Sequence, residues 1–158
     1  MSGELVIDSS VVVKWFIDET LDDISKLIRD EWKARRLICF APDLLFVEMG
    51  NIIWKKRRKN EITSDDASLV IDGLQRLPWR VTSTESLLHE AYAIATKTDR
   101  TVYDSCYLAL AKRLNCPFVT ADDRLANALA PHMPNVVKLS DWKPSPPTAL
   151  PPATTPTP

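Results

Sequence analysis

The sequence contains little of what several classes of protein need. No apolar run approaches the roughly 20 residues of a membrane-spanning helix, and the first residues lack the basic and apolar regions of a signal peptide. Three cysteines, Cys39, Cys106 and Cys116, form neither a disulfide framework nor a C-x-x-C metal motif, so we interpret them as structural. A net charge of -1 excludes binding of nucleic acid by bulk electrostatics. We therefore expect a cytoplasmic protein that does not enter a membrane.

Length and composition predict one globular domain followed by a tail. The chain has 158 residues, of which 45% are hydrophobic and 26% charged, and that is enough for one core of ordinary size. The composition changes near residue 143, and seven of the twelve prolines lie in the last fifteen residues. We predict a folded domain over 1–142 and a disordered or polyproline-like tail over 143–158.

Short strand patterns alternate with helical ones along the domain. Apolar runs predict strands at 4–8, 37–40, 79–82, 117–120 and 136–139. Helical spacing predicts helices at 9–17, from 20 onward, 42–60, 63–77, 82–98, 103–114 and 122–130. Thr20 and Thr82 are expected to open helices by capping boxes, and Pro42 to lie in a first turn. The alternation predicts an α/β fold, a three-layer α/β/α arrangement with a central parallel sheet.

Two acids directly follow predicted strands. Asp8 ends the run Leu5-Val6-Ile7, and Asp122 follows 118–121. The carboxyl ends of parallel strands meet at one edge of a sheet, which is where ligands bind in such folds. Each acid alone is better explained as a helix cap. Both at the same edge favour a shared site.

Two further acids lie on predicted helices. Glu48 interrupts a helix that is apolar almost all the way round, and a buried carboxylate needs a metal ion, a basic partner or water. Asp104 lies in the first turn of its helix, on the face that carries Tyr107 and Leu108. Its alternative role is a favourable charge at a helix N-terminus.

Four converging carboxylates would repel one another unless a cation bound between them. The only histidines, His89 and His132, have no partner at ligand spacing, so the ligands are oxygens, which select Mg²⁺ or Mn²⁺ over zinc. Such a site suits phosphoryl chemistry with a metal-activated water. Ser10 and Thr120 could orient a ligand or water, or could only cap local structure.

Two basic stretches offer local contacts to nucleic acid. One is the run at 55–59, Lys-Lys-Arg-Arg-Lys, and the other is the looser set Arg29, Lys33, Arg35 and Arg36. A solvated helix end, where cations complement the helix dipole, explains them about equally well.

Four motifs in this order resemble the PIN domain family, and most of all its VapC-type toxins. They are Val6 to Val11, Pro42 to Asn51, Tyr103 to Ala111 and Phe118 to Leu125, within a likeness that covers residues 4 to 142. The resemblance implies a Mg²⁺- or Mn²⁺-dependent endoribonuclease that acts on RNA, forms a homodimer and is inhibited by a small VapB-type antitoxin. It assigns the catalytic and metal-binding quartet to Asp8, Glu48, Asp104 and Asp122, and a supporting hydroxyl to Thr120. Asp123 has no assured counterpart, and the tail is not part of the pattern.

Other readings of the acids remain open. A haloacid dehalogenase type of phosphatase also begins with a strand ending in Asp, but it needs a second Asp where Ser10 stands. A phospho-receiver needs an N-terminal acidic pair and a late lysine, and neither is present. A catalytically silent PIN module that binds RNA or a protein partner fits the residues better, because four intact acids indicate that a site can form and not that it cleaves RNA.

Overall fold

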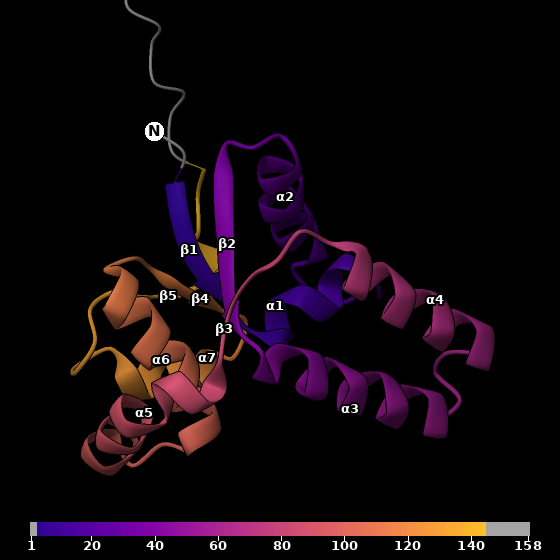
Figure 1. The fold of residues 1–158 in the computed structure, drawn as a ribbon. Helices are drawn as coiled ribbons and strands as arrows, with labels where there is room; N and C mark the ends of the chain where they lie inside the picture. Colours follow the sequence, from indigo (N-terminus) through magenta and orange to yellow (C-terminus); the bar gives the residue numbers. More distant parts are fainter. Residues whose placement is uncertain (1–2, 145–158) are drawn as a thin grey trace, which may run out of the picture.

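Five parallel strands form the central sheet of the protein. The computed structural model describes residues 3–144, and the strands lie in the order β3-β2-β1-β4-β5 (Figure 1). Their bounds are β1 Gly3–Ile7, β2 Leu37–Pro42, β3 Arg80–Thr82, β4 Phe118–Thr120 and β5 Val136–Lys138. The predicted parallel sheet is confirmed. The predicted tail lies outside the described residues except for its first two positions.

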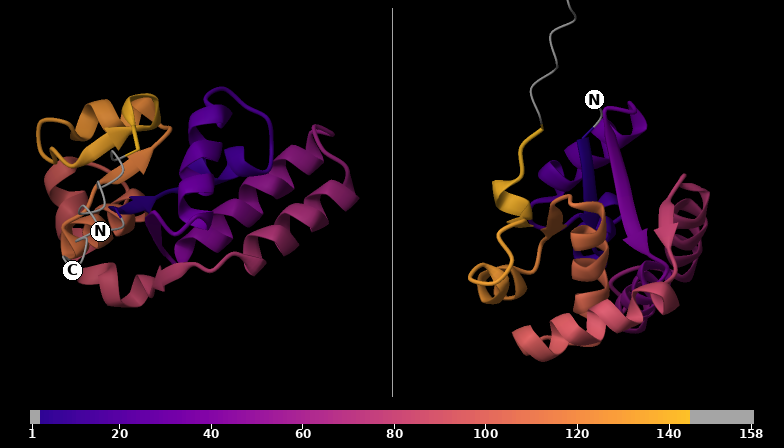
Figure 2. Two further views of the ribbon diagram at one scale, coloured as in Figure 1. Left: turned by 90° about the horizontal axis from the view of Figure 1, so that it is seen from above. Right: turned by 60° about the vertical axis from the view of Figure 1, so that its left-hand side comes forward.

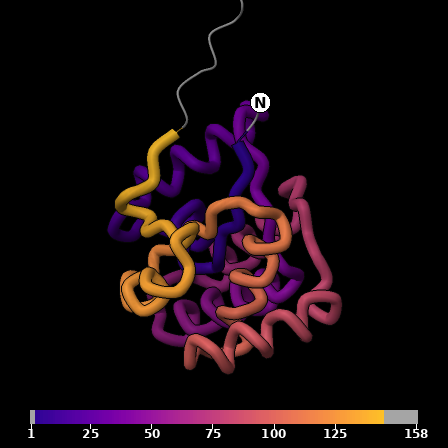
Figure 3. The backbone as a smooth tube through the Cα atoms, turned by 90° about the vertical axis from the view of Figure 1, so that its left-hand side faces the viewer, coloured from indigo at the N-terminus to yellow at the C-terminus, as the bar shows by residue number. Residues whose placement is uncertain are grey.

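Helices cover both faces of the sheet. They are α1 Ser9–Val12, the 3₁₀ turn η1 Val13–Trp15, α2 Asp22–Lys33, α3 Leu44–Arg58, α4 Ser64–Arg76, α5 Thr84–Thr98, α6 Val102–Leu114, α7 Asp123–Leu129 and the 3₁₀ turn η2 Leu139–Asp141. Because crossovers between parallel strands are right-handed and the strand order reverses after β3, α1 to α4 lie on one face and α5 to α7 on the other. Figure 2 shows the first group extending from the sheet as a pair of long helices, α3 and α4, and Figure 3 shows the second group from its own side. The three-layer α/β/α prediction is confirmed.

The core is centred on β1 and α6. Leu5, Val6 and Ile7 are almost completely buried, as expected of a middle strand covered on both faces. Every residue from Ser105 to Ala111 of α6 is also buried. The three cysteines are buried free thiols, which agrees with a packing role.

Three tryptophans fix the turn that follows α1. The rings of Trp15 and Trp79 stack with centroids 5.7 Å apart, and Trp32 lies 4.9 Å from Trp79. The indole nitrogen of Trp15 donates to the carbonyl of Ser25 at 2.8 Å, and that of Trp79 to Leu74 at 2.9 Å. The cluster therefore joins η1, α2 and the residue before β3.

Three local predictions about helix starts are wrong. Pro42 ends β2, where it is paired in register with Thr82 of β3, and α3 begins only at Leu44. Thr82 consequently cannot cap the next helix, whose first turn instead donates from Thr84 to the carboxylate of Asp43. Pro42 and Thr82 are therefore paired strand residues and do not belong to the helices that follow them.

The start of α2 also differs from its predicted form. Thr20 makes no capping box, because the chain enters the helix through Leu21 in the left-handed conformation, at φ 63°. The buried residues of α2 are Ser25, Ile28 and Trp32, whereas Leu21 and Leu27 are exposed. The helix predicted at 9–17 tightens into η1 at Val13.

Within residues 3–144, none of the helices combines the length and apolarity needed to cross a bilayer.

The N-caps of α4 and α5 allow a direct test of these local interactions. The Thr63 hydroxyl accepts a hydrogen bond from the backbone of Asp66 at 3.1 Å, and the Asp66 carboxylate accepts one from the backbone of Thr63 at 3.0 Å. Thr63→Ala should lower the free energy of unfolding by about 1 kcal/mol in urea denaturation. Ser83→Ala is the matched control, because the Ser83 side chain makes no capping bond, and it should change stability by less than about half as much. Equal losses in both variants would contradict this explanation.

Candidate active site

The site begins where the strand order of the sheet reverses. β1 lies between β2 and β4, and its pairing with β4 places Ile7 opposite Val119. Asp8 directly follows β1, and Thr120 is the last residue of β4. Ligands of parallel α/β sheets bind at such a switch point, outside the carboxyl ends of the strands.

Two hydroxyl groups hold the carboxylate of Asp8. Thr120 Oγ1 donates to Asp8 Oδ2 at 2.5 Å, and Ser10 Oγ donates to Asp8 Oδ1 at 2.5 Å. The backbone N–H of Val11 also donates to Oδ1, at 3.2 Å, which makes Asp8 the N-cap of α1. We refer to Asp8, Ser10 and Thr120 as the Asp8 clasp. The two hydroxyls predicted to support the site therefore both contact one of its acids.

The same hydroxyls accept hydrogen bonds from the chain that follows β4. The backbone of Ala121 donates to Ser10 Oγ at 2.9 Å, and that of Asp122 donates to Thr120 Oγ1 at 3.1 Å. Because each hydroxyl has one proton, these bonds orient both protons toward Asp8. The loop that carries Asp122 is thus attached to the Asp8 clasp through its backbone.

Asp8 is a carboxylate in an unfavourable environment. It is only 7% exposed, and burial raises the pKa of Asp8 to about 6, although the bonds from Ser10, Thr120 and Val11 oppose the shift. The negative charge of Glu48 raises the pKa further. The structure thus brings Glu48 of α3 close enough to Asp8 for their charges to interact.

Glu48 is held by a residue that the sequence did not single out for the site. The hydroxyl of Tyr107 donates to Glu48 Oε2 at 2.6 Å. Tyr107 is 2% exposed and its ring is stacked on Phe118 of β4, with centroids 5.9 Å apart. The available signal was a hydroxyl on the apolar face of α6, three residues after Asp104.

Burial also raises the pKa of Glu48, and the charge of Asp104 raises it further. Electrostatic repulsion therefore couples Asp104 to Glu48 and Glu48 to Asp8. The carboxylate of Asp104 accepts a hydrogen bond from the hydroxyl of Thr101 at 2.8 Å, and its backbone N–H donates back to that hydroxyl at 3.1 Å. Asp104 therefore completes the cap of α6 while its charge acts on Glu48.

Asp122 lies in the loop between β4 and α7. It is exposed and caps α7, with Oδ1 accepting from the backbone of Leu125 at 3.0 Å. Asp123 is the first residue of α7 and is also exposed. Asp122 is linked to Asp8 through Thr120, whose hydroxyl accepts from the backbone of Asp122 and donates to Asp8.

A divalent cation needs ligand atoms that lie close together. Within residues 3–144, no three acidic, histidine or cysteine side chains are close enough together to form a ready ligand group. The acids that do interact supply only oxygen, and Glu48 raises the pKa of Asp8 while Asp104 raises that of Glu48. A hard cation relieves such repulsion, and Mg²⁺ is commonly held by one or two carboxylates with waters completing its shell. The residues therefore suit such an ion.

Known proteins give a consistent set of similarities. The PIN domain family model matches residues 5–129. The ribonuclease VapC3 of Pyrobaculum aerophilum is 30% identical over 125 residues, which cover 78% of this chain and 92% of that protein. The ribonuclease VapC1 of Mycobacterium tuberculosis is 31% identical over 137 residues, covering 86% of this chain and 97% of that protein.

Solved structures share the fold at lower identity. The crystal structure of PAE2754 from Pyrobaculum aerophilum matches with a TM-score of 0.63 and 18% identity, over 87% of this chain and 85% of that one. Mycobacterium tuberculosis VapC20, described as a toxin that cleaves the sarcin-ricin loop, matches with a TM-score of 0.55 and 11% identity, over 74% and 87%. The chain belongs to the PIN domain family, among its VapC-type members.

The burial of Asp8 predicts how stability depends on pH without metal. The group titrates near pH 4 when unfolded and near pH 6 when folded, so its contribution is complete below pH 4 and is lost as the pH rises through 6. In protein treated with EDTA, Asp8→Asn should therefore gain up to about 3 kcal/mol relative to wild type between pH 4 and pH 7. Urea denaturation at each pH measures the difference.

Asp23→Asn, which replaces an exposed acid of α2, is the matched control and should show no such trend. A difference between Asp8→Asn and wild type that stays constant from pH 4 to pH 7 would contradict the raised pKa.

Proposed function

We propose that this protein is an endoribonuclease that acts as the toxin of a type II toxin–antitoxin pair. Membership of the PIN domain family and two relatives named VapC ribonucleases support the proposal. The observation that carries it is the Asp8 clasp, a buried carboxylate aligned by two hydroxyls at the switch point of the sheet. Residues that only stabilise a fold rarely bury an acid in this way.

In this proposal the catalytic and metal-binding acids are Asp8, Glu48, Asp104 and Asp122, and the ion is Mg²⁺ or Mn²⁺. When bound, such an ion neutralises the phosphodiester and lowers the pKa of a water that attacks phosphorus. The oxygen-only donors and the mutual repulsion of the acids support this choice.

The side chains of the protein have separate tasks in the proposed hydrolysis. Ser10 and Thr120 keep the two oxygens of Asp8 in a fixed orientation. Tyr107 occupies one oxygen of Glu48 and so fixes the direction of the other. The raised pKa of Glu48 suits it to accept a proton from the attacking water.

The proposal also includes protein partners and a compartment. We expect the protein to act in the cytoplasm, where its RNA substrate and a VapB-type antitoxin would meet it. Exposed large apolar side chains lie on two helices that pack together, Leu88 and Tyr92 of α5 and Tyr103 of α6, and these support a homodimer. Tyr103 precedes Asp104, so such an interface would lie beside the site.

Incubation with RNA tests the enzyme directly. Purified protein with Mn²⁺ should produce new ends in total cellular RNA, mapped by sequencing, and Asp8→Asn should abolish them, because it removes the only buried carboxylate of the site. Asp65→Asn, an exposed acid on α4, is the control and should retain full activity. Metal binding without any cleavage would select the silent PIN module instead.

A titration with Mn²⁺ tests the role of each acid in binding. Mn²⁺ should raise the melting temperature of the wild type by stabilising the folded state, and Asp8→Asn should lose this effect. Tyr107→Phe should raise the Mn²⁺ concentration at half effect by about tenfold, because Glu48 loses a hydrogen bond worth about 1.5 kcal/mol.

Tyr103→Phe removes the same hydroxyl from an exposed position of the same helix and should leave the titration unchanged. Equal Mn²⁺ titrations of the two tyrosine variants would exclude a positioning role for Tyr107. A wild-type melting temperature that millimolar Mn²⁺ leaves unchanged would contradict the proposed metal site.

A further inference from the structure

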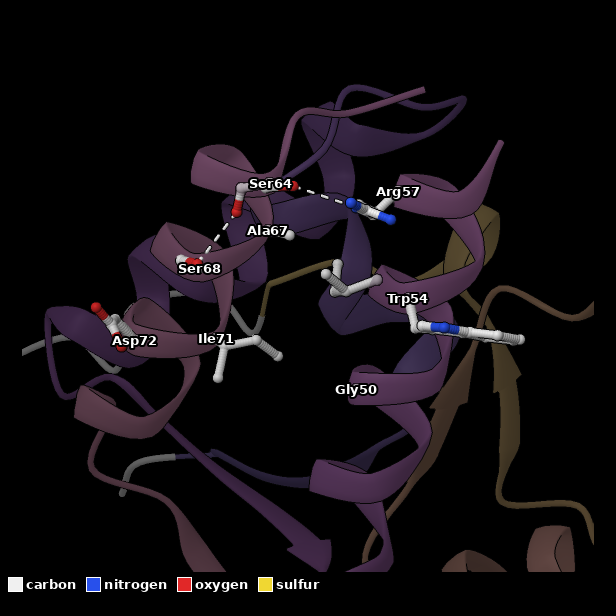
Figure 4. A pocket seen from close by; sticks show the side chains of 9 residues that line it. Gly50, Trp54, Arg57, Ser64, Ala67, Ser68, Ile71 and Asp72 are labelled. Carbon is white, nitrogen blue, oxygen red and sulfur yellow. Dashed lines mark hydrogen bonds between the residues drawn. The ribbon is translucent and has the colours of Figure 1, made fainter. Parts of the chain in front are cut away.

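Two members of the basic run at the end of α3 have structural partners. The ammonium group of Lys56 lies 2.8 Å from Glu19 and 3.3 Å from Glu61. Arg57 Nε donates to the hydroxyl of Ser64 at the start of α4, at 3.2 Å (Figure 4). These contacts attach α3 to the segment before α2 and to α4.

The other three cations have no such partner. Lys55, Arg58 and Lys59 are exposed and form no ion pair with any acid in residues 3–144. The negative pole of the helix dipole favours cations near this end, but it does not select one side of the helix. The helix dipole therefore does not explain on which face of α3 these three cations lie.

The two unpaired lysines share the helix face of Glu48. Lys55 is seven residues after Glu48 and Lys59 eleven, which is close to two and three full turns of α3. They follow Glu48 along the axis by roughly 10 and 16 Å. Lys55 belongs to the helix body and Lys59 is its C-cap. A row of positive charge thus leads directly away from the acidic site.

An exposed aromatic ring lies beside Arg58. Trp54 is 52% exposed, and the guanidinium carbon of Arg58 lies 5.0 Å from its ring centroid. Trp54 lines the edge of a cavity between α3 and α4, and Figure 4 shows its ring directed away from α4. Exposed aromatic rings next to cations are typical of surfaces that bind single-stranded nucleic acid.

We propose that Lys55, Arg58 and Lys59, with Trp54, form a subsite for the RNA strand on one side of the cleaved phosphate. This inference rests on the proposed ribonuclease function, because it takes Glu48 as the place where the strand is cut. The acidic site repels RNA and the chain carries no net positive charge to offset that repulsion. A row of cations that starts at the site supplies the attraction locally, and the ring offers a base a surface for stacking.

An acidic segment of a protein partner is the alternative occupant of this surface. The alignment of the lysines with Glu48 favours RNA, because the proposed function already places a phosphodiester at the acids, with a cation to neutralise it, whereas an acidic peptide has no group that must lie there. A phosphodiester strand whose cleaved phosphate lies among the acids has its neighbouring phosphates along α3.

Fluorescence anisotropy with a labelled single-stranded RNA of twelve mixed-sequence nucleotides tests the subsite. Titrations in EDTA prevent metal-dependent cleavage. The double variant Lys55→Ala/Lys59→Ala should bind about tenfold more weakly than wild type. The slope of log affinity against log salt should become shallower by about 1.4, which is the loss of two contacts to a single strand. Trp54→Ala should weaken binding with little change in that slope.

Arg76→Ala/Lys112→Ala is the matched control. Both side chains are exposed and without an ion pair in the described part of the chain, and they precede β3 and β4, at the opposite edge of the sheet from Asp8. This variant loses the same charge and should bind RNA as wild type does. An equal loss of RNA affinity in both double variants would show that only net charge matters, and it would overturn the subsite.

Three further outcomes test this inference and distinguish its failure from that of the proposed function. If wild type cleaves RNA but the Lys55/Lys59 variant keeps its affinity and salt slope, the subsite is wrong and the nuclease stands. If an oligoglutamate peptide of twelve residues binds more tightly than the RNA, with the same dependence on these lysines, the surface belongs to an acidic protein partner. Lysine-dependent RNA binding without any cleavage would support the surface and remove the nuclease.

Discussion

The hydrogen bond from Thr120 to Asp8 is the interaction on which the site depends. It joins residues 112 positions apart, and it can form only because β1 and β4 are neighbours at the place where the strand order reverses. The bond from Ser10 to the other oxygen fixes the carboxylate in two directions. Through these hydroxyls the sheet also determines where the chain carries Asp122.

This arrangement places the carboxylates of Asp8 and Glu48 in an environment that disfavours their charged form. The pKa of Asp8 and that of Glu48 are raised by burial and then by the neighbouring acids. Such groups destabilise the ionised protein, and in the proposed function a bound cation would relieve this cost, so that stability and metal affinity would be opposed at the same atoms. The wholly buried β1 and the buried centre of α6 provide the rigid support that holds the acids together against this repulsion.

Sequence patterns were sufficient for the parts of the site that the backbone determines. Asp8 and Asp122 were predicted to follow strands at one edge, because an apolar run fixes a buried strand and parallel strands share an edge, and Thr120 was predicted only as a supporting hydroxyl. The bond between Tyr107 and Glu48 could not be predicted, because it depends on how α3 and α6 approach one another. Thr82 failed as a cap for the same reason: its pairing with Pro42 is a long-range contact that outweighs a local preference.

The rotation of α3 about its own axis connects the acidic site with the basic row. Glu48 is fixed from one side by Tyr107, and Lys56, two turns further on, is fixed by Glu19, which also binds the buried Lys14 of η1 at 3.1 Å. Because a helix is rigid over this length, the two attachments together determine the side of α3 from which every other residue projects. Lys55 and Lys59 therefore project from the same face as Glu48. The ion pair of Lys56 with Glu19 thus helps to fix the face on which the two unpaired lysines lie.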